Sequence, residues 1–177
     1  WRVVTGGSQS YVRALRRPWQ VTERTRTPVH SLRRQGTGIV LRSSVGEEHF
    51  DQVVLACHAD DALRLLSDAS DVEREVLGGI TYRDNEAILH TDVRVLPTRR
   101  HAWAAWNAHV PVQPGAACSV SYWMNALQSL DAPEQFTVTL NRGNDIDPAR
   151  ILRRIHYRHP QQDHASVAAQ ARKQEIQ

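Results

Sequence analysis

The stretch Phe50-Asp51-Gln52-Val53-Val54-Leu55-Ala56-Cys57-His58-Ala59-Asp60-Asp61-Ala62-Leu63 decides how the rest of the chain is interpreted. Residues 53–57 form an unbroken apolar run, which is typical of a parallel strand covered on both faces. Apolar residues then recur at helical spacing over residues 59–66, with Asp60 and Asp61 in the first turn. The stretch therefore predicts a strand, a tight turn and a helix. Ligands of open α/β sheets collect at such turns, so we expect a site near Ala56-Cys57-His58.

A meander of antiparallel strands is predicted before this stretch. Val29 and Leu32 lie in an extended segment, and residues 39–41 form the next apolar segment. Gly36-Thr37-Gly38 joins these two extended segments. It therefore predicts a hairpin turn rather than a glycine-rich phosphate loop, which would join a strand to a helix.

A short helix is predicted near the start of the chain. Gly6-Gly7-Ser8 precedes it, and its residues Tyr11, Val12 and Leu15 are expected to point inward. Two interpretations of the glycine pair stay open: a plain turn with a helix cap, or a helix start that faces an anion.

Beyond residue 78 the pattern changes. A helix over residues 72–77 ends at Gly78-Gly79. Short apolar segments separated by Asn, Asp, Pro and Gly then predict antiparallel strands over residues 80–160, followed by a helix that begins at Asp163 or Ser166. We expect an α+β fold in two domains. Residues 1–78 carry the helix, the meander and the strand-turn-helix, and residues 79–177 carry the antiparallel sheet and a C-terminal helix.

Arginine supplies almost all of the positive charge of the chain. The net charge is +3, and Lys173 is the single lysine among 22 basic residues. Arginine binds phosphates and carboxylates in a bidentate manner, which is compatible with a nucleic-acid or dinucleotide partner. Coding bias also fills ordinary surfaces with arginine, and this is the interpretation we prefer.

The sequence disfavours a membrane-spanning protein and a disulfide-stabilised protein. No apolar run approaches the roughly 20 residues that span a bilayer, and no secretory leader is recognisable. Cys57 and Cys118 lie far apart and fit no zinc spacing, so we expect buried thiols of a cytoplasmic protein rather than a disulfide. The chain starts at Trp1 and stops at Gln177 inside a predicted helix, so we expect it to be a segment of a longer polypeptide.

The sequence contains no clear motif for a metal site or for catalysis by side chains. His156, His159 and His164 are close in sequence, but no Cys or carboxylate accompanies them in a zinc pattern, so no metal site is predicted. No nucleophile motif, catalytic carboxylate pair or P-loop is present, and the catalytic residue stays unknown. An enzyme without such groups often relies on a cofactor for the difficult chemistry.

Aromatic residues are concentrated in the second half of the chain. In an extended segment Trp103 and Trp106 fall on opposite faces, so one can pack in the core while the other lines a cavity. Tyr122 and Trp123 have the same two possible roles. Core packing and the lining of a ligand cavity both remain open for these four residues.

Several short motifs occur in a characteristic order: Gly6-Gly7-Ser8, Thr27-Pro28-Val29-His30-Ser31-Leu32, Gly38-Ile39-Val40-Leu41, Gly46-Glu47 and Phe50-Asp51-Gln52-Val53-Val54-Leu55-Ala56. In that order they resemble the flavin-containing amine oxidase and phytoene desaturase superfamily. Three more motifs are similar to those of a bacterial branch of NAD/FAD-binding oxidoreductases within it: Leu89-His90-Thr91-Asp92, Trp103-Ala104-Ala105-Trp106-Asn107 and Ser121-Tyr122-Trp123-Met124-Asn125.

The resemblance implies a partial FAD/NAD(P)-binding, Rossmann-like part with a β-meander, plus an antiparallel-sheet substrate domain. In such enzymes the main chain at the position of Val29 meets the adenine end of FAD, and the turn matching Ala56 and Cys57 lies beside the dinucleotide. The family's pyrophosphate-binding glycine-rich start and its last glycine-rich segment have no counterpart in this sequence. We therefore expect FAD in the full-length protein, and neither tight FAD binding nor turnover by this segment alone.

Two classes of function follow. In the first, the chain is part of an FAD-dependent oxidoreductase that passes hydride from a small apolar or aromatic substrate to flavin, with Trp103, Trp106, Tyr122 and Trp123 as cavity candidates. In the second, it is a non-catalytic β module that binds nucleic acid or a protein partner through an arginine face. That face would contain Arg24, Arg26, Arg33, Arg34 and Arg42. We prefer the first class. The oligomeric state and the electron acceptor are left open.

Overall fold

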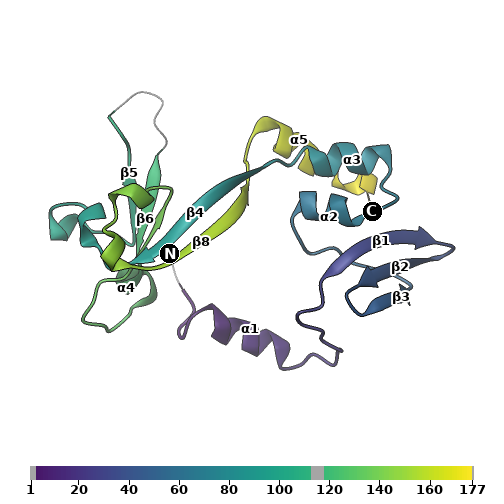
Figure 1. The fold of residues 1–177 in the computed structure, drawn as a ribbon, viewed down its shortest axis with the longest axis horizontal. Coiled ribbons are helices and arrows are strands. Elements are labelled where there is room, and N and C mark those ends of the chain that lie inside the picture. Colours follow the sequence, from purple (N-terminus) through teal and green to yellow (C-terminus); the bar gives the residue numbers. More distant parts are fainter. Residues whose placement is uncertain (1–2, 113–117, 177) are drawn as a thin grey trace. The chain divides into compact units, whose positions relative to one another are not determined.

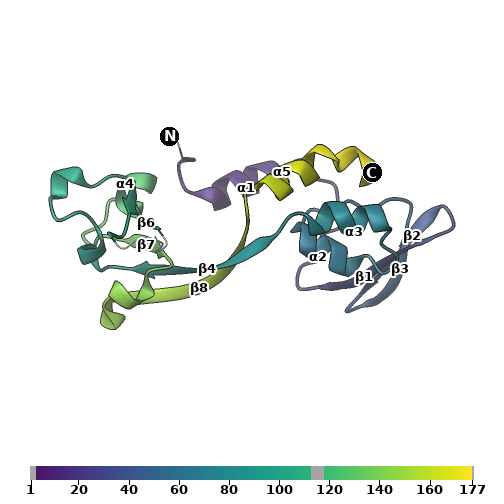
Figure 2. The same cartoon turned by 90° about the horizontal axis from the view of Figure 1, so that it is seen from above.

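The computed structural model describes residues 3–112 and 118–176 of the chain. The chain divides into two compact units. The meander unit comprises Val21–Arg83 and His159–Gln177, and the sheet unit comprises Trp1–Gln20 and Asp84–Arg158. Figures 1 and 2 show their helices and strands. Helices occur together with two antiparallel sheets, so the predicted α+β class is confirmed.

The sheet of the meander unit has three antiparallel strands in sequence order: β1 (Val29–Gln35), β2 (Gly38–Ser43) and β3 (Gly46–Phe50). Its buried side chains include Leu32 of β1 and Val40 of β2. Gly36, in the turn between these strands, has a φ of 60°, a left-handed conformation that glycine adopts without steric cost. The prediction of a hairpin turn at residues 36–38 is therefore confirmed.

Helices complete the meander unit: α2 (Ala59–Leu65), α3 (Asp71–Gly78), α5 (His164–Ala171) and the 3₁₀ helix η5 (Lys173–Ile176). α3 starts with a capping box, in which Ser70 Oγ accepts the Glu73 N–H and the Glu73 carboxylate accepts the Ser70 N–H. Asp163 caps α5 in the same manner, as the sequence suggested. Contacts join α2 to β1 and α3, and α3 to α5. The C-terminal helix thus packs in the meander unit, while the functional division of the chain at residue 79 stays a prediction.

Residues 53–57 do not form the expected covered strand. They belong to no strand, and the Val54 side chain is 89% exposed, whereas Val53 and Leu55 are half-buried. A parallel strand needs a hydrogen-bonded neighbour, and no described segment pairs with these residues. One face of the segment packs on the unit and the other faces outward. The prediction of a strand was wrong, and the prediction of a helix directly after the turn is confirmed by α2.

The sheet unit contains most of a five-stranded sheet with the order β5-β6-β7-β4-β8. Its strands are β4 (Tyr82–His90), β5 (Trp106–His109), β6 (Ser119–Trp123), β7 (Thr137–Leu140) and β8 (Ile151–Pro160). The pairs β5–β6, β6–β7 and β4–β7 are antiparallel. The antiparallel sheet predicted for the second half of the chain is therefore confirmed. The short helix α4 (Met124–Gln128) follows β6.

The two faces of this sheet differ. On one face Ile88 packs with Val95, Leu96 and Ile146, which lie in the connections that follow β4 and β7. Short 3₁₀ helices shape these connections: η1 (Val93–Val95), η2 (Arg100–Ala102), η3 (Gly143–Asp145) and η4 (Pro148–Arg150). On the opposite face, alternate residues such as Leu89 and Val138 are only half-buried. The first face is thus the covered face, and the second is the open face.

Helix α1 (Ser8–Arg16) forms where the sequence predicted a helix, but its apolar residues do not point into a core. Tyr11, Val12 and Leu15 are 53%, 44% and 46% exposed, so the expectation that they point inward was wrong. A helical stripe is buried only where another element packs on it, and no residue of α1 is buried. Among the described residues, no helix combines the length and the apolar character that crossing a bilayer requires.

Candidate functional site

A row of polar side chains lies on the covered face of the five-stranded sheet. Its members are 5% exposed or less: His90 on β4, Ser119 and Ser121 on β6, and Thr137 and Thr139 on β7. The strand register sets the row, because Ser121 lies opposite Thr139, and His90 lies opposite Thr137. Hydroxyl and imidazole groups thus occupy positions that aliphatic side chains usually fill in a sheet core.

A chain of hydrogen bonds connects three of these groups. The Asp92 N–H donates to His90 Nδ1 over 3.1 Å. Since a backbone N–H can only donate, Nδ1 carries no proton, and the Nε2–H of His90 donates to Thr139 Oγ1 over 2.8 Å. The Thr139 hydroxyl then has its own proton for Ser121 Oγ, 2.8 Å away. The neighbouring hydroxyls of Thr137 and Ser119 have no hydrogen-bond partner among the described residues.

The charges beside the row are balanced. Hydrogen bonds from the Arg94 guanidinium hold the pKa of Asp92 well below its usual range, and the Asp147 N–H adds a further bond. Burial lowers the pKa of His90, against the opposing charge of Asp92, so the imidazole is neutral near pH 7. Asp92 is 1% exposed, and it ties the connection after β4 to the connection after β7. The row and its ion pair therefore hold the covered face together.

The four aromatic candidates form two pairs. Trp103 and Trp123 meet edge to face, with ring centroids 5.2 Å apart, and both pack against the core of the covered face. Their indole N–H groups are bonded to Pro97 O and Gln135 Oε1. Trp106 and Tyr122 form a second edge-to-face pair, also at 5.2 Å, in the cross-strand pair of β5 and β6. The structure brings each pair together and separates the two pairs, and their role in a substrate cavity stays a prediction.

A cavity of about 490 Å³ lies on the open face of the sheet. This sheet pocket is formed by residues of β4, β7, β8, α4 and the connection between α4 and β7. They are Ala87, Leu89, Met124, Gln128, Leu130, Phe136, Val138, Ile155 and Tyr157. None of the four aromatic candidates lines it. Period-two alternation in β4 and β7 was the signal that could have identified its walls.

A larger cavity, of about 770 Å³, lies in the meander unit. Side chains of β1, α2, α3, η5 and the segment at residues 53–57 line this meander pocket, Cys57 among them. Of the other predicted cofactor residues, Val29 opens β1 opposite Ser43, and Ala56 lies exposed directly before Cys57. Neither of them lines the pocket. Cys57 and Cys118 are both exposed free thiols, so the expectation that they are buried was wrong.

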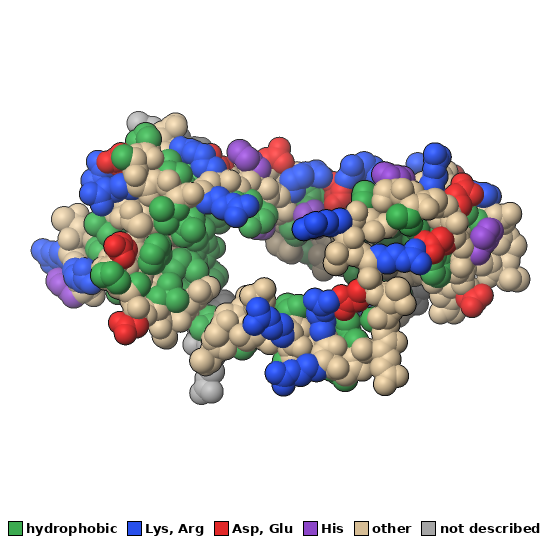
Figure 3. Space-filling view, turned by 60° about the horizontal axis from the view of Figure 1, so that its bottom comes forward, with side chains coloured by type: hydrophobic (Ala, Val, Ile, Leu, Met, Phe, Trp, Pro, Cys, Tyr) green, Lys and Arg blue, Asp and Glu red, His purple; other side chains and the backbone are tan. Residues whose placement is uncertain are grey.

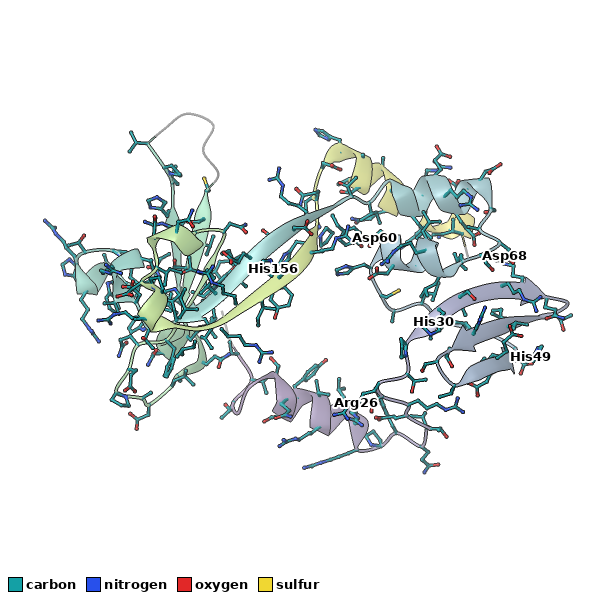
Figure 4. All side chains as sticks on the ribbon, in the orientation of Figure 1. Arg26, His30, His49, Asp60, Asp68 and His156 are labelled. Atoms are coloured by element: carbon teal, nitrogen blue, oxygen red, sulfur yellow. The ribbon has the colours of Figure 1, made fainter. Side chains whose placement is uncertain are left out.

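The turn before α2 is fixed by Tyr82. The His58 ring stacks on the Tyr82 ring at a centroid distance of 4.5 Å, and the Tyr82 hydroxyl accepts the Ala59 N–H over 2.8 Å. Asp60 and Asp61, the first of which is labelled in Figure 4, come within 4.8 Å of His58 through their possible ligand atoms. Asp61 already forms an ion pair with Arg64. Two carboxylates at the start of α2 disfavour a phosphate there.

Two of the five arginines proposed for a basic face are neutralised by carboxylates. Arg24 pairs with Glu48, and Arg34 pairs with Glu73 and with Asp68, which is labelled in Figure 4. Burial raises the pKa of Glu73, but hydrogen bonds from Ser70 and Arg34 outweigh it, so the pKa lies below its usual value. Asp68 also accepts the Arg34 N–H over 2.7 Å. These arginines fasten β1 and β3 to neighbouring segments, which weakens the case for a basic interaction surface.

Comparison with known proteins supports the same fold. The family model described as flavin containing amine oxidoreductase matches residues 1–110. This match spans the meander, α2, α3 and the start of the five-stranded sheet, which is more than half of the chain. The chain therefore belongs to the family of flavin-containing amine oxidoreductases.

Two solved structures share the fold. A CLA-producing fatty acid isomerase from P. acnes aligns with a TM-score of 0.63 and 14% identity, over 97% of this chain and 44% of that chain. A putative protoporphyrinogen oxidase from Exiguobacterium sp. 255-15 aligns with a TM-score of 0.56 and 16% identity, over 96% of this chain and 43% of that chain. The present chain thus spans less than half the length of either protein. A search of curated proteins gives no match.

Proposed function

We propose that the chain is the substrate-domain portion, with part of the cofactor-binding portion, of an FAD-dependent oxidoreductase. The observation that carries the proposal is the match of the flavin-containing family over residues 1–110, which includes both the meander and the first strand of the five-stranded sheet. In the full-length protein a C–N or C–C bond of the substrate would be oxidised to a double bond, with hydride passing from its C–H to the flavin and a proton leaving the neighbouring N or C. When bound, FAD supplies the electron acceptor that the side chains of this chain lack.

The segment before α2 suits main-chain contacts with a dinucleotide. No backbone hydrogen bond joins residues 53–57 to another described residue, and Ala56 and Cys57 are exposed. Their N–H and C=O groups are therefore free for the contacts that the family places beside the cofactor. Val29 pairs with Ser43, so it would contribute only the main-chain groups that the β1–β2 pairing leaves free. The acidic first turn of α2 does not suit the pyrophosphate. The residues present therefore fit the adenine end of FAD better than its phosphates, and we expect the chain alone to bind FAD weakly.

Hydrogen exchange tests the assignment of these main-chain contacts. The protein is prepared with the flanking segments that its gene encodes, once with its flavin and once after flavin removal. We expect slower amide exchange at Val29, Ala56 and Cys57 in the flavin-bound form, and unchanged exchange in β7 of the sheet unit. Equal exchange at these three positions in both forms would remove them from the cofactor site.

We also propose that the protein lies in the cytoplasm of a bacterium, where two exposed thiols stay reduced.

An oligonucleotide-binding assay distinguishes the oxidoreductase from the alternative, an arginine-rich binding module. A module of that kind should bind oligonucleotides with an affinity that falls steeply as salt rises. We expect no such binding by the 177-residue chain. Tight, salt-dependent binding would favour the module and count against the oxidoreductase.

A further inference from the structure

We infer that the sheet pocket binds an uncharged hydrocarbon segment of a ligand. That this ligand is the substrate rests on the proposed function, whereas the binding itself does not. The pocket lies on the open face of the five-stranded sheet, within the sheet unit, and its volume of about 490 Å³ lies in the range of small-molecule sites. Figure 3 shows hydrophobic side chains gathered on one face of this unit, at the left of the view.

The lining determines the chemical class of the ligand. Seven of the nine lining residues have hydrocarbon or thioether side chains, and the other two, Gln128 and Tyr157, carry neutral polar groups. An ammonium or carboxylate group placed among such side chains would lose its hydration without gaining a charged partner. A hydrocarbon chain gains free energy from the same transfer. The pocket therefore selects neutral apolar groups over charged ones.

One ion pair of the neighbouring strands lies on the other face of the sheet. Glu86 of β4 pairs with Arg154 of β8 over 2.6 Å. Successive side chains of a strand alternate between faces, so Glu86 points away from Ala87, and Arg154 points away from Ile155. A side chain built at Gly143 would meet Glu86, Arg154 and the core residue Ile88, which places this ion pair on the covered face. This ion pair thus lies away from the pocket, on the opposite face of the sheet.

The pocket walls are held by hydrogen bonds rather than by packing alone. The Met124 N–H donates to Phe136 O over 2.9 Å, and the Phe136 N–H donates to Asn125 Oδ1 over 2.7 Å. Asn125 Nδ2 also donates to Glu134 O. These bonds fasten α4 to the segment that leads into β7. Met124 and Phe136 are therefore fixed opposite the side chains of β4 and β8, and the pocket is preformed.

Met124 makes the inference directly testable, because it is the single methionine of the chain. When the chain is released from a cleavable N-terminal tag, so that no initiator methionine remains, labelling with ¹³C-methyl methionine gives one NMR signal, and it comes from the pocket wall. The 177-residue chain is titrated at pH 7 with octanol, octylammonium and octanoate, which share one chain length and differ in charge. We expect a saturable shift with octanol, and affinities at least about tenfold weaker for both ions. No saturable shift, or an ion that binds as well as octanol, would overturn the inference.

Matched variants locate the binding. Leu130 lines the pocket and is 39% exposed, whereas Leu152 lies outside it on β8 and is 56% exposed. Leu130→Asp should weaken octanol binding at least about tenfold, and Leu152→Asp should leave it unchanged. Equal losses in both variants would place the ligand elsewhere. Gln128 is exposed at the rim, so Gln128→Glu leaves the fold intact and should raise the affinity for octylammonium while lowering that for octanoate. No change of either affinity would also contradict the inference.

The assay separates this inference from the proposed function, because it contains no flavin. Octanol binding together with a full-length protein that lacks flavin would retain the pocket and reject the oxidoreductase. A flavin-bound protein whose sheet pocket binds no octanol would retain the oxidoreductase and reject the pocket as a ligand site.

Discussion

Thr137 and Thr139 are a matched pair that tests the polar row of the sheet unit. Both lie on β7, point to the covered face and have 0% exposed side chains. Thr139 Oγ1 is bonded to His90 Nε2 and to Ser121 Oγ, each over 2.8 Å. Thr137 Oγ1 has no partner among the described residues. Replacing either residue with valine exchanges the hydroxyl for a methyl group of similar size, so the two variants differ in hydrogen bonding alone.

The expected magnitudes follow from these contacts. Thr139→Val removes two hydrogen bonds and leaves the Nε2–H of His90 buried without an acceptor, which should lower the free energy of unfolding by about 2–4 kcal/mol. Thr137→Val removes no bond and buries a methyl group instead of an unbonded hydroxyl. It should change the free energy of unfolding by about 0.5 kcal/mol or less, or raise it.

Urea unfolding followed by tryptophan fluorescence measures both effects, since Trp103 and Trp123 pack on the covered face. With a slope of about 1–3 kcal/mol per molar urea, the Thr139→Val midpoint should fall by about 0.7 M or more. Equal destabilisation by the two variants would refute the assigned hydrogen-bond chain. So would a Thr139→Val chain as stable as the unsubstituted one.

Three further predictions concern charge and capping. Because burial lowers the pKa of folded His90 below the unfolded value of about 6.5, its contribution to stability is present above that pH and is lost as the pH falls below it. The urea midpoint should decline with acidification less steeply in His90→Gln, and an unchanged slope would contradict the assignment. Asp92→Asn removes the charge that accepts Arg94 and the Asp147 N–H, so at pH 7 it should cost about 2 kcal/mol in urea unfolding. Since the pKa of Asp92 is lowered on folding, this cost should shrink as the pH falls through the acid range, and a constant cost would count against the ion pair. Ser70→Ala removes the cap of α3 and should cost about 1 kcal/mol, with Ser70→Asp close to neutral; equal losses in both would exclude capping as the cause.

Local rules were enough to predict several elements from the sequence. Glycine at residue 36 marks a turn that only a left-handed residue completes, and the structure places a hairpin there. The change of period at residue 59 predicted α2, and the punctuated apolar segments predicted the antiparallel sheet. Each of these signals depends on near neighbours in the sequence.

Features that depend on distant partners were not predictable in this way. An apolar run at residues 53–57 looks like a covered strand, but whether it joins a ladder depends on a neighbouring strand that the run itself does not specify. The alternation of Ser119 with Ser121 and of Thr137 with Thr139 does not by itself say which face of the sheet these hydroxyls occupy. The register with His90 turns these hydroxyls to the covered face. Nor did the aromatic residues indicate the sheet pocket, whose walls come from four separate elements and the connection before β7.

The flavin content of the longer protein decides whether this chain is part of a flavin-dependent oxidoreductase. The coding region on both sides of this segment is expressed with it, and the ratio of released FAD to protein is measured after purification. We expect about one FAD for each longer chain and little or none for residues 1–177 alone. A longer chain that purifies without flavin and does not take up added FAD would contradict that assignment.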